Sequence, residues 1–64
     1  MEFQLQFWTE TFVVTVYQGK DINKMNRVRM KCEEEAEQKE YEDYGFTVYG
    51  REPIVNRWTV IPWM

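Results

Sequence analysis

The stretch EFQLQFWTETFVVTVY, residues 2–17, decides the fold, because side-chain character alternates along both of its halves. Residues 2–8 place an apolar set opposite a mainly polar one, and residues 12–17 alternate again with period two, now with Val13, Thr15 and Tyr17 on the second face. Such alternation indicates two β-strands that each bury one face. The two sets expected in the core are Phe3, Leu5 and Phe7 from the first strand and Phe12, Val14 and Val16 from the second.

A turn at Thr9 and Glu10 joins these strands into a hairpin and fixes which residues face each other across it. It predicts the cross-strand pairs Phe7 with Phe12, Leu5 with Val14 and Phe3 with Val16. Thr-Glu is a poor two-residue turn, and a four-residue loop over residues 8–11 preserves the same pairs. The other face of the finished sheet should carry Trp8, Val13, Tyr17, Thr47 and Tyr49.

A helix follows the hairpin. Asp21 is a suitable N-cap, and Gly45 is a natural C-terminal stop, so the helix is predicted over residues 22–43. Apolar residues recur within it at spacings of three and four, which marks a single buried stripe. The residues of this stripe are Ile22, Met25, Val28, Cys32 and Ala36.

The last third of the chain returns to period two. Phe46 and Val48 indicate a third strand, residues 50–53 a turn, and residues 54–61 a fourth strand that Pro62 ends or marks as an edge. We therefore predict an α+β fold, a small ββαββ domain over residues 1–64 with a largely antiparallel sheet and one helix packed on one face. Phe46 and Val48 complete the predicted core.

The composition argues against catalysis. The chain has no histidine and no serine, which removes the commonest general base and the commonest nucleophile. Cys32 is the one cysteine, so neither an internal disulfide nor a thiolate zinc site is expected. Glu33, Glu37 and Glu40 share a helix face, but they supply too few oxygens for calcium. We expect a non-enzymatic protein without a cofactor or a bound metal.

The sequence also predicts a compartment. Residues 1–6 lack the basic and apolar regions of a signal peptide, and no apolar run approaches the roughly 20 residues that span a bilayer. Together with a lone cysteine, this favours the reducing cytoplasm and no membrane. The net charge of −3 argues against direct nucleic-acid binding.

The charges of the predicted helix run in the opposite order to the one that stabilises an isolated helix. Its first half is basic and its second half is acidic, whereas the helix dipole favours the reverse. The basic residues are Lys20, just before the helix, and Lys24, Arg27, Arg29 and Lys31 within it. The acidic residues are Glu33, Glu34, Glu35, Glu37, Glu40, Glu42 and Asp43. A partner surface is the simplest explanation for this order.

Three surfaces are candidates for that partner. The first is the outer helix face, where carboxylates surround a methionine and a tyrosine, residue types that are enriched at interfaces. Its residues are Met30, Glu33, Glu34, Glu37, Tyr41 and Glu42. The second is the uncovered sheet face with Trp8 and Tyr17, and the third is the apolar tail with Trp63. In an alternative interpretation, Tyr41 covers the end of the helix and the acidic face is only solvated.

The leading hypothesis is a small acidic inhibitor that binds a basic, nucleic-acid-binding surface of a host enzyme, with its carboxylates imitating phosphates as in DNA mimics. In length, acidity and aromatic content the chain resembles the small accessory proteins by which bacteriophages inhibit host enzymes. The first alternative is a self-associating structural or scaffold protein, a homodimer in which the basic half of each helix meets the acidic half of the other. The second is a weak single-stranded nucleic-acid binder that stacks bases on Trp8 or Tyr17.

Overall fold

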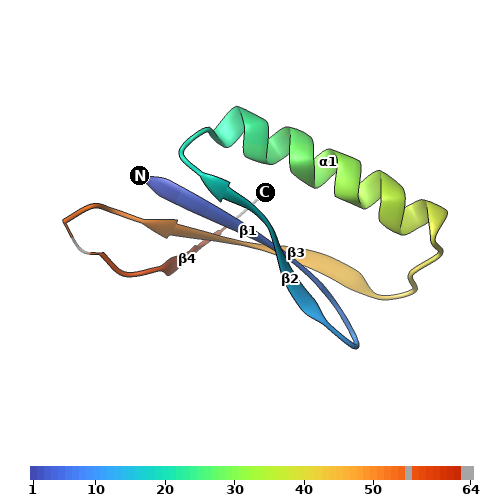
Figure 1. Cartoon of the computed structure of the whole chain (residues 1–64). Coiled ribbons are helices and arrows are strands. Elements are labelled where there is room, and N and C mark those ends of the chain that lie inside the picture. The colour runs from blue at the N-terminus through green and yellow to red at the C-terminus, as the bar shows by residue number, and fades with distance from the viewer. Residues whose placement is uncertain (55, 63–64) are drawn as a thin grey trace.

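The computed structural model describes residues 1–54 and 56–62. Their order is β1 (Glu2–Thr9), β2 (Val13–Gly19), α1 (Ile22–Gln38), β3 (Tyr44–Arg51) and β4 (Thr59–Ile61). The strands form one sheet in the order β2-β1-β3-β4, every neighbouring pair is antiparallel, and α1 lies on one face (Figure 1). The predicted ββαββ fold is confirmed.

The first strand is central to this architecture. β1 pairs with β2 on one side and with β3 on the other, and both neighbours run antiparallel to it. β2 and β3 are therefore parallel to each other, with β1 between them. The connection through α1 carries the chain from one side of β1 to the other.

The hairpin register differs from the predicted one by two residues. Phe7 faces Val14 rather than Phe12, because the turn closes through a 2.9 Å hydrogen bond from the Thr9 N–H to the Phe12 carbonyl. The hydroxyl oxygen of Thr9 also accepts from the backbone N–H groups of Thr11 and Phe12. A shift of two keeps each residue on its face, so the alternation alone could not reveal it.

A bulge in β2 then moves Tyr17 to the helix side of the sheet. Gln6 pairs with Thr15 and Leu5 with Tyr17, which leaves Val16 as the extra residue. An extra residue reverses the alternation beyond it. Tyr17 accordingly packs against the core, and its hydroxyl accepts a 3.1 Å hydrogen bond from the Asp21 N–H. Its predicted place on the uncovered face was wrong.

The core lies between α1 and the two middle strands. Its buried residues are Leu5, Phe7, Met25, Ala36 and Val48, all of them predicted. The predicted residues Phe3, Val16, Val28 and Phe46 are partly buried and pack against it, and Cys32 is half-buried. Phe12, Val14 and Ile22 are exposed, which contradicts the prediction. Phe12 belongs to the turn, Val14 to an outer strand with one neighbour, and Ile22 to the first turn of the helix.

The helix begins as predicted and ends earlier. An oxygen of the Asp21 carboxylate accepts from the N–H groups of Asn23 and Lys24, at 3.0 and 3.1 Å. At the other end, the N–H of Tyr41 donates to the Ala36 carbonyl and that of Glu40 to the Glu37 carbonyl. These are the two bonds of a Schellman motif, with Glu40 in the left-handed conformation at φ 57°. The predicted end at residue 43 was wrong because this motif closes the helix without glycine.

The fourth strand is shorter than predicted. It covers Thr59–Ile61 instead of residues 54–61, and it lies at the edge of the sheet with Pro62 directly after it. The connection from β3 contains a turn in which the Asn56 N–H donates to the Glu52 carbonyl at 2.9 Å. In the described part of the chain, no helix is both long and apolar enough to span a membrane.

Candidate partner-binding surfaces

The outer face of α1 keeps three of the six residues predicted for it. Met30 is 55% exposed, and the Glu34 and Glu37 side chains are also exposed. Glu33 is partly buried and forms a 3.0 Å ion pair with Arg29, one turn earlier on the same helix. The charge of Glu33 is therefore compensated within the domain, whereas Glu34 and Glu37 form no ion pair with the residues that the structure describes.

Tyr41 and Glu42 lie in the α1–β3 loop and not on the helix face. The Tyr41 ring packs on Phe7 and Phe12, with ring centroids 6.2 and 6.3 Å away. It belongs to an aromatic cluster centred on Phe7, whose other rings are Phe12, Tyr41, Tyr44 and Phe46. Tyr41 thus covers the end of the helix while keeping about a third of its surface exposed.

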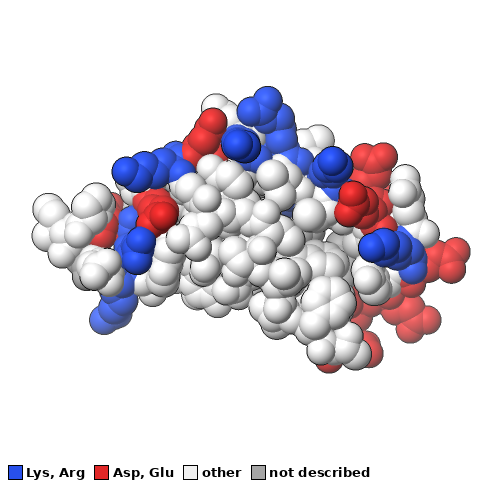
Figure 2. All heavy atoms as spheres, in the orientation of Figure 1, with Lys and Arg blue, Asp and Glu red and all other residues white. Residues whose placement is uncertain are grey.

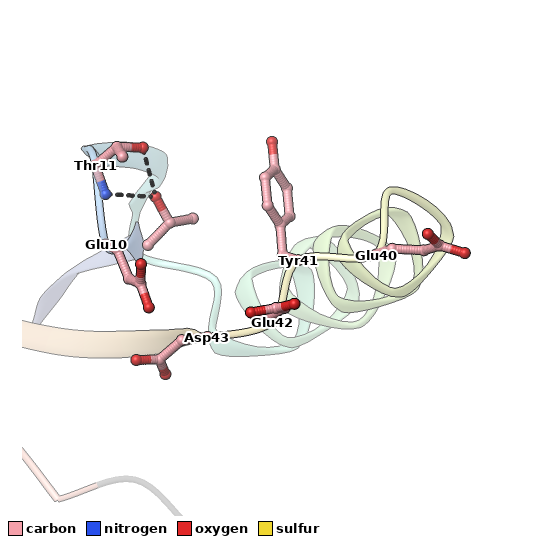
Figure 3. Close-up of a pocket in the computed structure, with 7 residues that line it drawn as sticks. Glu10, Thr11, Glu40, Tyr41, Glu42 and Asp43 are labelled. Carbon is pink, nitrogen blue, oxygen red and sulfur yellow. Dashed lines mark hydrogen bonds between the residues drawn. The ribbon is translucent and has the colours of Figure 1, made fainter.

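A groove of about 230 Å³ separates the α1–β3 loop from the β1–β2 turn (Figure 3). Four carboxylates line it, together with Tyr41 and the hydroxyls of Thr9 and Thr11. We call these four residues the acidic end: Glu10, Glu40, Glu42 and Asp43. In Figure 3 the Glu10 side chain points toward Glu42 and Asp43, whereas Glu40 points away from them. None of the four forms an ion pair within the described residues.

Glu10 was missed by sequence reasoning. It is 30 residues from the nearest other acidic-end residue in the chain, and the sequence around it predicts only a turn. The signal that could have found it is the topology. The β1–β2 turn and the start of β3 lie at the same end of an antiparallel sheet, since Thr9 pairs with Tyr44. The fold therefore adds a carboxylate to a group that the sequence places in one segment.

Charge is segregated along the molecule. In Figure 2, Asp and Glu gather at the end where α1 finishes, while Lys and Arg lie along α1 and toward the opposite end. The carboxylates of α1 also shift the pKa of a neighbouring tyrosine. Partial burial raises the pKa of the Tyr44 hydroxyl above its ordinary value, and the carboxylates of Glu37 and Glu33 raise it further.

The uncovered sheet face is more polar than predicted. Trp8, Val13, Thr47 and Tyr49 lie on it, as the register requires, but Tyr17 does not. Two glutamines, Gln4 and Gln6, precede Trp8 on this face of the central strand. At one end Arg51 pairs with Glu2 and stacks 4.6 Å from the Trp58 ring centroid. Trp63, the third predicted surface, lies outside the described residues.

Cys32 offers little reactivity. Burial raises the pKa of its thiol above the usual value, the Glu35 carboxylate adds to the rise, and Lys31 opposes it. A thiol shifted in this direction is protonated at neutral pH and is a weak nucleophile. No group of three or more Cys, Asp or Glu side chains among the described residues is arranged to hold a metal ion.

Comparison with protein families, curated proteins and solved structures found no match for this chain.

Proposed function

We propose that this protein is a non-enzymatic inhibitor that binds a basic surface of another protein through its acidic end. The observation that carries this proposal is the meeting of Glu10 with Glu42 and Asp43 across the groove, without an ion pair to any described cation. The residues come from two segments far apart in the sequence. Their convergence is a property of the fold and not of one acidic run.

The arrangement is unfavourable for the isolated domain. Like charges that gather at one end repel one another, and this repulsion destabilises a compact state. A basic partner surface replaces repulsion by attraction and also accelerates association, because complementary fields steer the encounter. Tyr41 sits among these carboxylates with part of its ring exposed. Aromatic residues in such positions are common anchors of binding energy.

The most specific form of the proposal is that the carboxylates imitate a nucleic-acid backbone. The Cβ atoms of helical residues three or four apart, such as Glu34 and Glu37, lie about 5–6 Å apart, which is close to phosphate spacing. Glu34 and Glu37 on the exposed face of α1 continue the charge of the acidic end along the molecule. The partner would be a cytoplasmic polymerase, nuclease or repair enzyme whose nucleic-acid channel is blocked. In composition the chain resembles the small accessory proteins by which bacteriophages inhibit host enzymes.

The test begins with an affinity pull-down from the lysate of the native host, followed by elution with double-stranded DNA. DNA should release the partner, because both ligands compete for one basic surface. The purified partner is then titrated with wild-type protein and with two single variants, Glu10→Lys and Glu52→Lys. Both glutamates are exposed and lie in turns, but at opposite ends of the sheet. The two variants therefore change the net charge equally and differ only in position.

We expect Glu10→Lys to slow association and to weaken binding by at least about tenfold, or about 1.4 kcal/mol, while Glu52→Lys stays close to wild type. Added salt should slow association of the wild-type protein. Equal losses of affinity in both variants would mean that binding depends on the net charge of the protein and not on the position of Glu10. Unchanged affinity of Glu10→Lys would remove the acidic end as the contact, and a partner that DNA does not release would remove the phosphate mimicry.

A further inference from the structure

The two outer strands of the sheet differ in how well their free edges are protected. β4 has three residues, and Pro62, which has no N–H, follows it. β2 has seven residues, Val13–Gly19, without a charge or a proline. Short strands, prolines and charges are the usual means by which proteins prevent an edge from pairing with another chain. The bulge at Val16 is the protecting feature that β2 does have, and pairing with β1 is regular on both sides of it.

The surface along β2 is apolar. Val13 on the uncovered face and Val14 on the helix face are both exposed, and so is Phe12 just before the strand. Between β2 and α1 runs a groove of about 150 Å³, lined in part by Phe12, Val16 and Cys32. Figure 2 shows a broad uncharged area below α1, in the region where Figure 1 places β2.

The position of α1 favours a second copy of the chain as the occupant of this edge. α1 packs against β2 and β1. Neighbouring strands lie about 4.8 Å apart. Because α1 contacts both β2 and β1, each helix axis lies about half a strand spacing inside its β2. Pairing of β2 with the β2 of a second copy adds one full spacing, so the two helix axes lie about 10 Å apart. Packed helices have interaxial distances of about 8–10 Å. Strand pairing and helix packing can therefore be satisfied by the same contact.

Two charges of α1 complement those of an antiparallel copy. Glu35 and Lys39 line the groove beside β2, and Lys24 and Lys31 lie on the same flank of the helix at 3.6 residues per turn. A two-fold axis reverses the second helix and sets Lys24 of one copy near Glu35 of the other, twice. These two contacts place opposite charges together, whereas Glu33, Glu34 and Glu37 lie away from this flank of the helix.

We infer that two copies of the chain associate through antiparallel pairing of their β2 edges, which joins two four-stranded sheets into one and lays the α1 helices side by side. The four carboxylates of the acidic end do not line the groove between β2 and α1, whereas Tyr41 lines both grooves. The contact uses the free edge of β2, the apolar surface beside it and the opposite charges of Lys24 and Glu35.

The test is sedimentation equilibrium of the wild-type chain and two variants matched in chemistry and exposure. Val13 on β2 is 64% exposed and Val60 on β4 is 59% exposed, and both lie on the uncovered face. We expect a wild-type dimer at micromolar concentrations, a dissociation constant raised at least about tenfold by Val13→Lys, and no change with Val60→Lys. Circular dichroism of each variant should match the wild type, because both side chains are exposed.

A second experiment tests the helix arrangement. Lys24→Glu and Glu35→Lys should each weaken the dimer, since each places like charges opposite one another, and the double variant should restore it. Glu10→Lys should leave it unchanged. A monomer at every concentration, an equal effect of Val13→Lys and Val60→Lys, or a double variant weaker than both single ones would overturn the inference.

Discussion

The indole of Trp8 lies directly over Gly45, its partner across the β1–β3 pair, where a β-carbon would overlap the ring. Glycine normally weakens a strand, by roughly 0.5–1 kcal/mol relative to alanine. Here it provides the space that lets a large aromatic ring lie flat on the uncovered sheet face. The position of the Trp8 ring therefore depends on glycine at position 45.

Gly45→Ala should destabilise the protein by about 1–3 kcal/mol, the usual cost of overpacking, although alanine is the better strand residue. Urea unfolding measures this change. The same substitution in a Trp8→Ala background should be neutral or stabilising, because the ring that it displaces is gone. Equal effects in the two backgrounds would show that Trp8 does not depend on Gly45.

Asp21→Ala should destabilise the protein by about 0.5–2 kcal/mol, because the N–H groups of Asn23 and Lys24 lose their acceptor at the start of α1. Asp21→Asn is the matched control, since it keeps an oxygen in the same place and removes only the charge. Thermal unfolding followed by circular dichroism should rank the wild type and Asp21→Asn together above Asp21→Ala. A loss in Asp21→Asn as large as in Asp21→Ala would assign the effect to charge.

Glu40→Gly should stabilise the protein by about 0.5–1 kcal/mol. Left-handed backbone costs a non-glycine residue roughly 1–2 kcal/mol, and part of the gain is lost to the greater entropy of unfolded glycine. Glu40→Ala removes the same charge and keeps the strain, so chemical denaturation of both variants separates the two contributions. If alanine stabilises as much as glycine, charge repulsion at the acidic end dominates.

The ion pair between Glu2 and Arg51 should make stability depend on pH. The hydrogen bond from Arg51 holds the pKa of the Glu2 carboxyl below its ordinary value of 4.5, although partial desolvation opposes this. A lowered folded-state pKa contributes stability that is complete above 4.5 and is lost as pH falls through the folded-state value. Glu2→Gln should be less stable than wild type at pH 7, and the difference should shrink as pH falls below 4.5. Glu52, an exposed glutamate, forms no ion pair with the described residues, so Glu52→Gln should show no such convergence.

The sequence predicted the faces of β1 correctly, because alternation with period two depends only on which side chains must be buried. It did not predict the hairpin register, which depends on the Thr9 to Phe12 hydrogen bond and on the bulge at Val16. A shift of two residues leaves the alternation intact. A bulge within a run of β-branched residues produces no recognisable sequence pattern. Tyr17 was misplaced for this reason.

The predicted helix end and the predicted placement of Tyr41 and Glu42 on the outer helix face were wrong for one reason. Glycine most readily adopts the left-handed conformation, so the sequence predicts a stop at Gly45, yet Glu40 adopts this conformation within a Schellman motif. Tyr41 and Glu42 consequently belong to a loop. Glu10 joined them only through sheet topology, which no local pattern of charges contains. The acidic character of the site was visible in the sequence, but its shape was not.

The central position of β1 has a consequence for the order of folding. β1 and β2 are separated by a three-residue turn and can meet early, whereas β3 reaches the other side of β1 only after residues 20–43 have been traversed. Contacts that close long segments form later than local ones. During synthesis, the hairpin therefore emerges complete while the second edge of β1, with its backbone N–H and C=O groups, is still unpaired. Delayed emergence of β3 should leave that edge open to other chains, so the length of the segment between β2 and β3 sets how long the edge is exposed to misassembly.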